Sequence, residues 1–256
     1  MSFSADWLAL RLPADIAARN PILAARLAAH FAGRADLRIL DLGAGSGNNM
    51  VATTPWLPRG QTWCLADADA ALLDAAPSPD FVTVEHRVAD LVQGIAPLLS
   101  PRLDLVTASA FFDLCGAAWL EQFAEDLAAS GAMLYALLSY DGREVWQPPD
   151  RADPAVLHAF HADQKRDKGF GPALGPDAHS HLADLLRTRG YEVLEAPSDW
   201  QLSQPRDADL IAALAEGSAT AVRPALGALA EEWGTSRSRA SAVTIGHQDL
   251  LALPPF

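Results

Sequence analysis

The sequence predicts an α/β protein in which a doubly wound, mostly parallel sheet of seven strands carries helices on both faces. Short apolar runs alternate with segments of helical periodicity between residues 37 and 140, and strands separated by helices of this length are joined by right-handed crossovers and lie parallel. A glycine-rich turn follows the first apolar run, as it does where such sheets bind ligands. An N-terminal helical cap and helical inserts after the fifth and sixth strands complete the prediction.

Each element is predicted from its own local pattern. A helix over 14–32 is favoured by apolar residues at helical spacing and by a high alanine content. The apolar run 37–42 indicates a buried strand, and the helix expected over 47–57 stops near Pro58, which cannot continue it. Up to residue 140, the further expected strands are 62–67, 81–88, 103–110 and 132–140, and the further expected helices are 68–76, 91–99 and 117–130.

The regular alternation ends after residue 140. Prolines and glycines are frequent from 141 to 176, with one expected helix at 153–166. A long segment of this kind in a compact domain is usually functional or disordered, and its aromatic and apolar content favours an ordered lid. The elements expected beyond it are a helix at 178–189, a strand at 191–196, a helical excursion at about 207–233 and a last strand at 240–247.

Composition restricts the class of protein. A chain of 256 residues, 50% of them hydrophobic, can bury a large core, and we expect a single domain. The first residues lack a secretory-signal pattern, and no apolar run of about 18 residues occurs; we therefore expect a cytoplasmic protein without a membrane partner. Cys64 and Cys115 have no metal-ligand or redox spacing. A net charge of −13 without a basic run argues against nucleic acid as a partner.

The stretch ILDLGAGSGNN places three alternating glycines after the first strand. A dinucleotide fingerprint would need a glycine at the position of Asn48, and a phosphate-binding loop would need a lysine after Gly47, so neither pattern is met. What remains is an acidic residue, Asp41, beside a loop that contains Gly43, Gly45 and Gly47. A carboxylate there suits a ligand that carries an ammonium group and lacks phosphates.

The chain resembles the class I S-adenosylmethionine-dependent methyltransferases at four landmarks. DLGAGSG at 41–47 is similar to their first motif, and Asp67 lies where the family's acidic residue ends the second strand and takes the ribose hydroxyls. Asp90 lies where the family's residue after the third strand meets the adenine amine. LDLVTASAFFDL at 103–114 is similar to the fourth strand and its catalytic exit loop.

The resemblance implies S-adenosyl-L-methionine as the cofactor. The residues expected to hold it are Asp41, Gly43, Ala44, Gly45, Gly47, Asn48, Asp67, Ala68, Asp90, Leu91 and Ser109. Helix capping is an alternative role for Asp67 and Asp90, because aspartate is a common N-cap, and Asp69 could instead cap the helix at 68–76. Asp41 is expected to order the loop more than to touch the ligand, and the glycines are also compatible with a structural turn.

Methyl transfer from a sulfonium is an in-line displacement in which the protein mainly aligns the reactants and excludes water. No metal is required, and we expect none. Four histidines fall within 24 residues, but no carboxylate or cysteine completes a ligand pattern around His158, His161, His179 and His181. Nucleotide-amine methyltransferases carry an N/D-P-P-Y/F motif where this chain reads SAFFDLCG, so a small-molecule substrate is favoured over DNA or RNA.

The candidate catalytic residues are Asp113, Tyr140 and His161. Asp113 follows the fourth strand and could accept a proton or bind a cation, although a solvent-facing helix start is an alternative. Lys165 and Lys168 are the only lysines of the chain, and with Phe170 as an apolar wall we expect them to bind a carboxylate or phosphate of the substrate, because an anion needs local positive charge in so acidic a protein. An exposed charged turn is the alternative for this segment.

We expect one methyltransferase domain, 1–256, in four parts: a helical cap at 1–35, a cofactor-binding half at 36–140, a substrate-covering insert at 141–178 and a C-terminal half at 179–256. The resemblance covers the second part well and the last part in outline. Segment 6–19 of the cap is expected to close over the site. The competing hypotheses are a catalytically silent adenosyl-ligand binding or partner protein on the same fold and an NAD-linked oxidoreductase, against which Asn48 argues.

Overall fold

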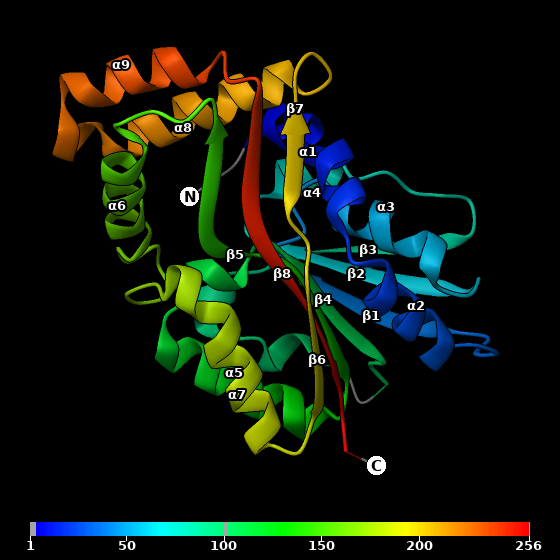
Figure 1. Ribbon diagram of the computed structural model, residues 1–256. Helices are drawn as coiled ribbons and strands as arrows, with labels where there is room; N and C mark the ends of the chain where they lie inside the picture. Colours follow the sequence, from blue (N-terminus) through cyan, green and yellow to red (C-terminus); the bar gives the residue numbers. More distant parts are fainter. Residues whose placement is uncertain (1–3, 100–101, 256) are drawn as a thin grey trace.

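The computed structural model describes residues 4–99 and 102–255, which form one sheet with helices on both faces (Figure 1). The strands are β1 (Leu37–Leu42), β2 (Gln61–Asp67), β3 (Val82–Val88), β4 (Leu105–Ser109), β5 (Met133–Gln147), β6 (Glu192–Pro197), β7 (Trp200–Ser203) and β8 (Ala242–Leu253). Their order is β3-β2-β1-β4-β5-β8-β6, with β7 paired to β8. The first five strands are parallel, and β8 runs antiparallel to its neighbours. The predicted doubly wound fold is confirmed, with the short β7 as an additional strand.

The helices agree with the prediction best in the middle of the chain. The helices of the described residues are α1 (Ala5–Ala18), α2 (Pro21–His30), α3 (Asn48–Thr53), α4 (Ala70–Asp74), α5 (Ala117–Ser130), α6 (Asp153–Gln164), α7 (Ala178–Thr188), α8 (Ala208–Leu226) and α9 (Ala228–Arg237). The helix expected over 117–130 is α5, and the one expected over 91–99 is two 3₁₀ turns. In the described part of the chain, no helix is long and apolar enough to span a membrane.

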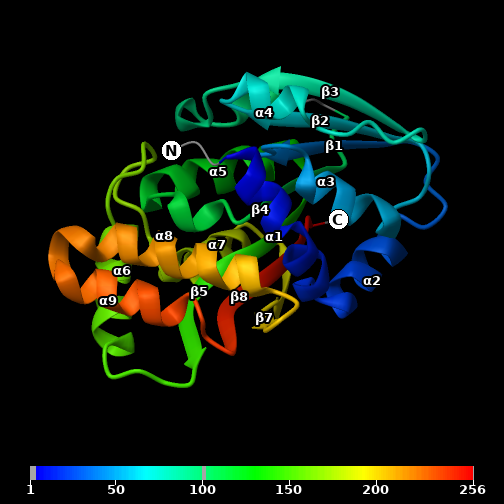
Figure 2. The same cartoon turned by 90° about the horizontal axis from the view of Figure 1, so that it is seen from above.

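Alternate residues of the central strands belong to two separate cores. Ile39 of β1 lies in the buried cluster that includes Leu27 of α2, whereas Leu40 lies in the cluster that includes Phe123 of α5 and Leu186 of α7. Figures 1 and 2 accordingly show α1 and α2 on one side of the sheet and α5 and α7 on the other. Strands buried on both faces are apolar at nearly every position, which explains the continuous apolar runs in the sequence.

The N-terminal segment forms two helices instead of one helix over 14–32. α1 begins earlier than expected, with Ser4 as its N-cap. α2 begins at Pro21, and the Asn20 side chain accepts hydrogen bonds from the N–H groups of its first turn. A capping asparagine followed by proline is a strong helix start, so the chain changes direction at this point although the apolar periodicity continues through it.

β5 continues past its expected end at residue 140 and runs to Gln147. Its pairing with β8 is irregular between Tyr140 and Glu144, and Gly142 in between has a φ of +90°, as in a β-bulge. The first residues of the expected insert 141–178 are therefore strand. This extension is covered by α6, α8 and α9 (Figure 1); the expected excursion 207–233 is the pair α8 and α9, which ends at residue 237.

Candidate active site

The sheet reverses its winding direction next to β1. β2 and β3 lie on one side of β1, and β4 and β5 lie on the other. Ligands of open α/β sheets bind beyond the carboxyl ends of the strands at such a reversal. The segments that leave β1 and β4 there are the glycine loop, residues 43–47, and the exit loop, residues 110–114.

The glycine loop has a backbone conformation that other residues rarely adopt. Gly43, Gly45 and Gly47 have φ values of +61°, +51° and +77°. A Cβ atom on Gly43 would lie 2.8 Å from the Phe111 ring, and one on Gly45 would lie 2.9 Å from Leu8 of α1. The loop is thus packed tightly between the exit loop and α1, which contains most of the segment 6–19.

A small cavity lies between the glycine loop and α1. This glycine-loop cavity has a volume of about 50 Å³ and is lined by Leu8, Arg11, Asp15, Arg19, Gly43, Ala44, Gly45, Asn48, Asn49 and Ser109. Asn48 Nδ2 donates a 2.6 Å hydrogen bond to the Leu8 carbonyl oxygen and ties α1 to the start of α3. Arg11 and Asp15 of α1 and its C-cap residue Arg19 line the cavity at four-residue spacing.

Two residues that line the glycine-loop cavity, Arg19 and Asn49, belong to a buried hydrogen-bond network. Arg19 donates to Thr53 Oγ1 at 2.7 Å and to Asn49 Oδ1 at 2.6 Å. Asn49 Nδ2 in turn donates to Asp41 Oδ1 at 2.6 Å and to Thr107 Oγ1 at 2.9 Å. Burial raises the pKa of Asp41 to about 7 and lowers the pKa of Arg19. Asp41 is buried and bonds to Asn49 of α3, so its expected role in ordering the loop stays a prediction.

A second cavity adjoins the first near the exit loop. This aromatic cavity has a volume of about 160 Å³ and is lined by Trp7, Arg11, Ala110, Asp113, Leu114, Leu138, Tyr140, Glu144, Trp146, Phe160, Gln164, Trp200, Leu214, Ser218, Ile245 and His247. The lining residues come from α1, the exit loop, the β5 extension, α6, β7, α8 and β8. The two cavities share Arg11, and the neighbours Ser109 and Ala110 line one each.

Arg11 stands at the junction of the two cavities. Its Nε and Nη2 donate to the two carboxylate oxygens of Asp15 at 2.9 and 3.1 Å. Its guanidinium lies 4.9 Å from the ring centroid of Trp200, and Trp200 Nε1 donates to Asp15 at 3.1 Å. Burial raises the pKa of Asp15 although the positive charge of Arg11 opposes that shift. The charged pair fixes α1 against β7 at the wall between the cavities.

Two strained residues line the aromatic cavity. Among the described non-glycine residues, only Ala110 and Leu138 have positive φ values, of +51° and +53°. Ala110 N donates to the Leu137 carbonyl oxygen, and Leu138 N donates to the buried Asp249 carboxylate at 2.9 Å. Such conformations cost about 1–3 kcal/mol each and concentrate at functional sites. Both strained residues therefore support the assignment of this region as the site.

The three candidate catalytic side chains lie in or beside the aromatic cavity. Tyr140 Oη donates to Glu144 Oε1 at 3.0 Å and lies 3.1 Å from His161 Nε2. Burial raises the pKa of Asp113 to about 6 and raises those of Tyr140 and Glu144, and it lowers the pKa of His161. Asp113 and Tyr140 line the cavity, whereas His161 contacts it through Tyr140.

Unpaired polar atoms are concentrated around the aromatic cavity. Eleven buried side-chain nitrogen or oxygen atoms of the described residues have no hydrogen-bond partner. Four of these atoms belong to lining residues of this cavity: Trp7 Nε1, Asp113 Oδ1, Gln164 Oε1 and His247 Nδ1. Buried polar groups are nearly always paired in native proteins, so the cavity has the character of a binding site for a polar molecule.

Comparison with known proteins identifies the fold. No protein-family model matches the sequence, and no curated protein is similar to it. A cyclopropane synthase of Mycobacterium tuberculosis has a similar structure, with a TM-score of 0.55 at 15% identity, over 98% of this chain and 94% of that protein. A cyclopropane-fatty-acyl-phospholipid synthase-like protein of Lactobacillus casei has a TM-score of 0.51 at 16% identity, over 95% and 99%.

A mycolic acid cyclopropane synthase, solved with S-adenosylhomocysteine, has a TM-score of 0.51 at 14% identity, over 90% of this chain and 83% of that one. The chain has the class I methyltransferase fold. This fold was expected from the glycine loop and from the order of the acidic landmarks. Within the methyltransferase fold, the glycine loop and the exit loop follow the two strands beside the reversal.

The remaining cofactor candidates of this methyltransferase fold lie along the same edge of the sheet. Asp67 accepts from Gly45 N at 2.8 Å and from Asp69 N at 2.9 Å, and Asp69 rather than Asp67 caps α4. Asp90 is exposed and caps a 3₁₀ turn. Of the others, Ala68 is exposed and Leu91 has its side chain in the core.

The two lysines of the insert lie outside both cavities. Lys165 pairs with Asp177 at 3.2 Å, and Lys168 pairs with Asp163 at 3.2 Å. Neither lysine lines a cavity described above. Phe170 packs edge-on against Phe111 and Trp119, so it supports the exit loop from the side opposite the glycine loop. Anion binding by the two lysines stays a prediction.

Several site residues were not identified from the sequence. Arg11, Asp15 and Arg19 repeat at four-residue spacing in an otherwise apolar helix, and this polar stripe was a usable signal for a functional face. Glu144 and Trp146 were missed because the fifth strand was predicted to end at residue 140. Four members of the cavity are aromatic residues scattered along the chain, and no local pattern connects Trp7, Trp146, Phe160 and Trp200.

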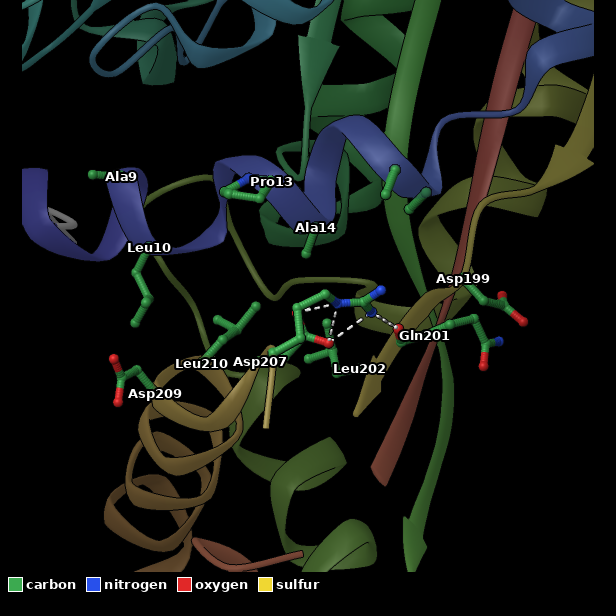
Figure 3. Close-up of a pocket in the computed structure, with 13 residues that line it drawn as sticks. Ala9, Leu10, Pro13, Ala14, Asp199, Gln201, Leu202, Asp207, Asp209 and Leu210 are labelled. Carbon is green, nitrogen blue, oxygen red and sulfur yellow. Dashed lines mark hydrogen bonds and ion pairs between the residues drawn. The ribbon is translucent and has the colours of Figure 1, made fainter. Parts of the chain in front are cut away.

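The largest cavity near α1 is an outer groove of about 710 Å³ between α1, β7 and the start of α8. Figure 3 shows Leu10, Pro13 and Ala14 facing Leu202, Asp207 and Leu210 across it. Asp207 is paired with Arg206, and among the described residues none that lines the groove has an unpaired buried polar atom. Within the same part of the chain, no cluster of three or more acidic, histidine or cysteine side chains could hold a metal ion.

Proposed function

We propose that the protein transfers a methyl group from S-adenosylmethionine to a small molecule bound in the aromatic cavity. The observation that carries this proposal is the pair of adjoining cavities at the reversal of the sheet, one beside the glycine loop and one lined by unpaired polar atoms. The volume of the second cavity, about 160 Å³, is below the range typical of drug-sized ligands. This supports a small acceptor.

The residues of the glycine-loop cavity fit the amino-acid end of the cofactor. Arg19 Nε is buried without a partner, and the Arg19 guanidinium suits a carboxylate. Asp67 and Asp90 would hold the adenosyl end. The cavity accommodates only part of this molecule, so we expect α1 to move outward on binding and to break the hydrogen bond between Asn48 and Leu8.

The chain's own residues would position the acceptor and exclude water. S-adenosylmethionine supplies a methyl group on a sulfonium sulfur; its transfer breaks the S–C bond, leaves those electrons on sulfur and forms a bond to a lone pair of the acceptor. The hydrophobic rings around the cavity would exclude water, and the strained residues Ala110 and Leu138 would hold the lining of the acceptor cavity in one geometry. Asp113 Oδ1 would accept a proton from the acceptor.

The test is calorimetric titration of the full chain with S-adenosylhomocysteine, followed by a screen of small acceptors for its release from S-adenosylmethionine. We expect binding together with turnover of at least one acceptor class. Absence of binding would refute the cofactor assignment. Binding without turnover of any acceptor would favour the catalytically silent alternative, and binding of NAD instead would favour an oxidoreductase.

A further inference from the structure

The four unpaired atoms of the aromatic cavity define the chemistry of its occupant. Asp113 Oδ1 and Gln164 Oε1 are acceptors, and they require a ligand that donates hydrogen bonds. We propose that this cavity binds a small protonated aliphatic amine as the methyl acceptor, an inference that rests on the proposed methyl transfer. The amine nitrogen supplies the missing donors, and Trp7 Nε1 offers a donor to any oxygen elsewhere on the molecule.

The charges around the cavity favour a cation. Asp113 and Glu144 contribute two carboxyl groups, and burial lowers the pKa of His247 to about 3, so that the imidazole is neutral. The lining cation is Arg11, and Asp15 binds it through both oxygens. The overall charge of −13 acts in the same direction at long range. A carboxylate or phosphate would be repelled at the same place.

The aromatic lining supplies a second source of attraction for a cation. Trp7, Tyr140, Trp146, Phe160 and Trp200 are five of the sixteen lining residues, whereas aromatic residues make up 7% of the chain. Ring faces attract ammonium groups by about 2 kcal/mol when the site is shielded from water.

The volume limits the length of the amine. Because a water molecule takes about 30 Å³, a cavity of about 160 Å³ has room for about five non-hydrogen atoms, and a further cavity of about 190 Å³ that shares Glu144, Trp146, Phe160 and Ser218 adjoins it. A chain of four carbons with one nitrogen meets this limit. The unpaired acceptors require at least one N–H bond, so a primary or secondary amine is favoured over a quaternary ammonium ion.

Methylation requires that the bound ammonium ion lose a proton, because its nitrogen otherwise has no free electron pair. Asp113 lies at the exit loop beside the glycine loop, and its unpaired Oδ1 can take that proton: an N–H bond breaks, an O–H bond forms, and the electron pair remains on nitrogen. With a pKa raised to about 6, the carboxylate is a stronger base than an ordinary aspartate and is still ionised at neutral pH.

The experiment compares three four-carbon probes with the full chain at pH 8 in the presence of S-adenosylhomocysteine. n-Butylamine is cationic, n-butanol is neutral and butanoate is anionic, and binding is followed by tryptophan fluorescence, since Trp7, Trp146 and Trp200 line the cavity. We expect the amine to bind about tenfold more tightly than the alcohol, as one desolvated cation–π contact and a carboxylate would give. Equal or tighter binding of the alcohol or of butanoate would overturn the inference.

Variants test the assignment to this cavity. Asp113→Asn should reduce the preference for the amine at least twofold, while the aromatic rings keep part of it, with unchanged affinity for S-adenosylhomocysteine as proof of folding. Asp184→Asn makes the same chemical change on α7, where the side chain is 77% exposed, and should leave the preference intact. An undiminished preference in Asp113→Asn would also overturn the inference. Failure of the unmodified chain to bind S-adenosylhomocysteine would instead refute the proposed function. The probe titration is a separate measurement, so the two failures can be distinguished.

Discussion

The glycine-loop cavity and the aromatic cavity are neighbours, but their polar groups are satisfied in different ways. Around the first, Arg19, Asn49, Asp41 and Thr107 bond mainly to one another. Around the second, four buried polar atoms have no partner among the described residues. The first arrangement holds a loop in a shape that only glycine permits, and the second leaves bonding capacity for a ligand. The difference is one of degree, because two unpaired buried atoms, Arg19 Nε and Asp41 Oδ2, belong to the first network and four lie around the second cavity.

The strongest test of this separation is Arg11, which belongs to both cavities. Arg11→Ala would leave the Asp15 carboxylate buried without its partner; the two side chains are 12% and 7% exposed. We expect a loss of about 3 kcal/mol in the free energy of unfolding and weaker binding in both cavities, measured by urea denaturation and calorimetry. The double variant Arg11→Gln with Asp15→Asn should recover much of the stability. If Arg11→Ala stays stable and weakens binding in only one cavity, the two cavities are independent.

A change beside the glycine loop, away from the aromatic cavity, should affect only the cofactor. Asp67→Ala removes the acceptor for Gly45 N and Asp69 N, and we expect S-adenosylhomocysteine to bind more weakly by about 1–3 kcal/mol. Calorimetry gives this value, and fluorescence should show unaltered n-butylamine affinity. Unchanged affinity for S-adenosylhomocysteine would remove Asp67 from the cofactor site.

Ionisation of Asp113 in the second cavity should determine the pH dependence of turnover. The pKa of Asp113 is raised to about 6 by burial, so the ionised carboxylate that accepts the proton is lost below that pH. We expect kcat/KM to fall about tenfold per pH unit below pH 6, and Asp113→Asn to abolish this limb. For stability the sign is opposite: burial opposes ionisation, so the contribution of Asp113 to stability decreases as the pH rises from about 4 to about 6. A flat profile would exclude Asp113 as the base.

The smallest effect is expected from the insert lysine. Lys168 is paired with Asp163 and lines neither cavity, so Lys168→Ala should cost less than about 1 kcal/mol of stability and leave acceptor saturation unchanged. The hypothesis that the lysines bind an anionic acceptor predicts instead that Lys168→Ala raises the acceptor KM. A higher acceptor KM with normal cofactor affinity would support that hypothesis.

The two cavities also differ in how much of them the sequence reveals. The glycine loop and Asp67 lie in short sequence motifs. Their roles can be predicted from residues that lie within about 30 positions of them in the sequence. Helix α5 was located from local periodicity alone, because its buried face repeats regularly. The fold class followed from the same local patterns.

The aromatic cavity depends on contacts that local patterns do not contain. The Asp141–Gly142 pair has the composition of a tight turn, but Gly142 occupies a bulge that allows β5 to continue, and Glu144 thereby becomes part of the cavity. β7 has four residues, too few for a recognisable alternation. Its Trp200 joins Trp7 from the other end of the chain only after the tertiary structure has formed.

The break between α1 and α2 has a mechanical consequence. Tyr140, Glu144 and Trp146 lie on a strand hydrogen-bonded into the sheet, so their wall is stationary. α1 carries the opposite wall, and at its carboxyl end the chain is anchored where Asn20 N donates to the buried Asp249. If α1 moves outward when the cofactor binds, as proposed above, Asn20 is the point about which it would turn. Because α1 lines both cavities, one movement would then open the donor site and the acceptor site together.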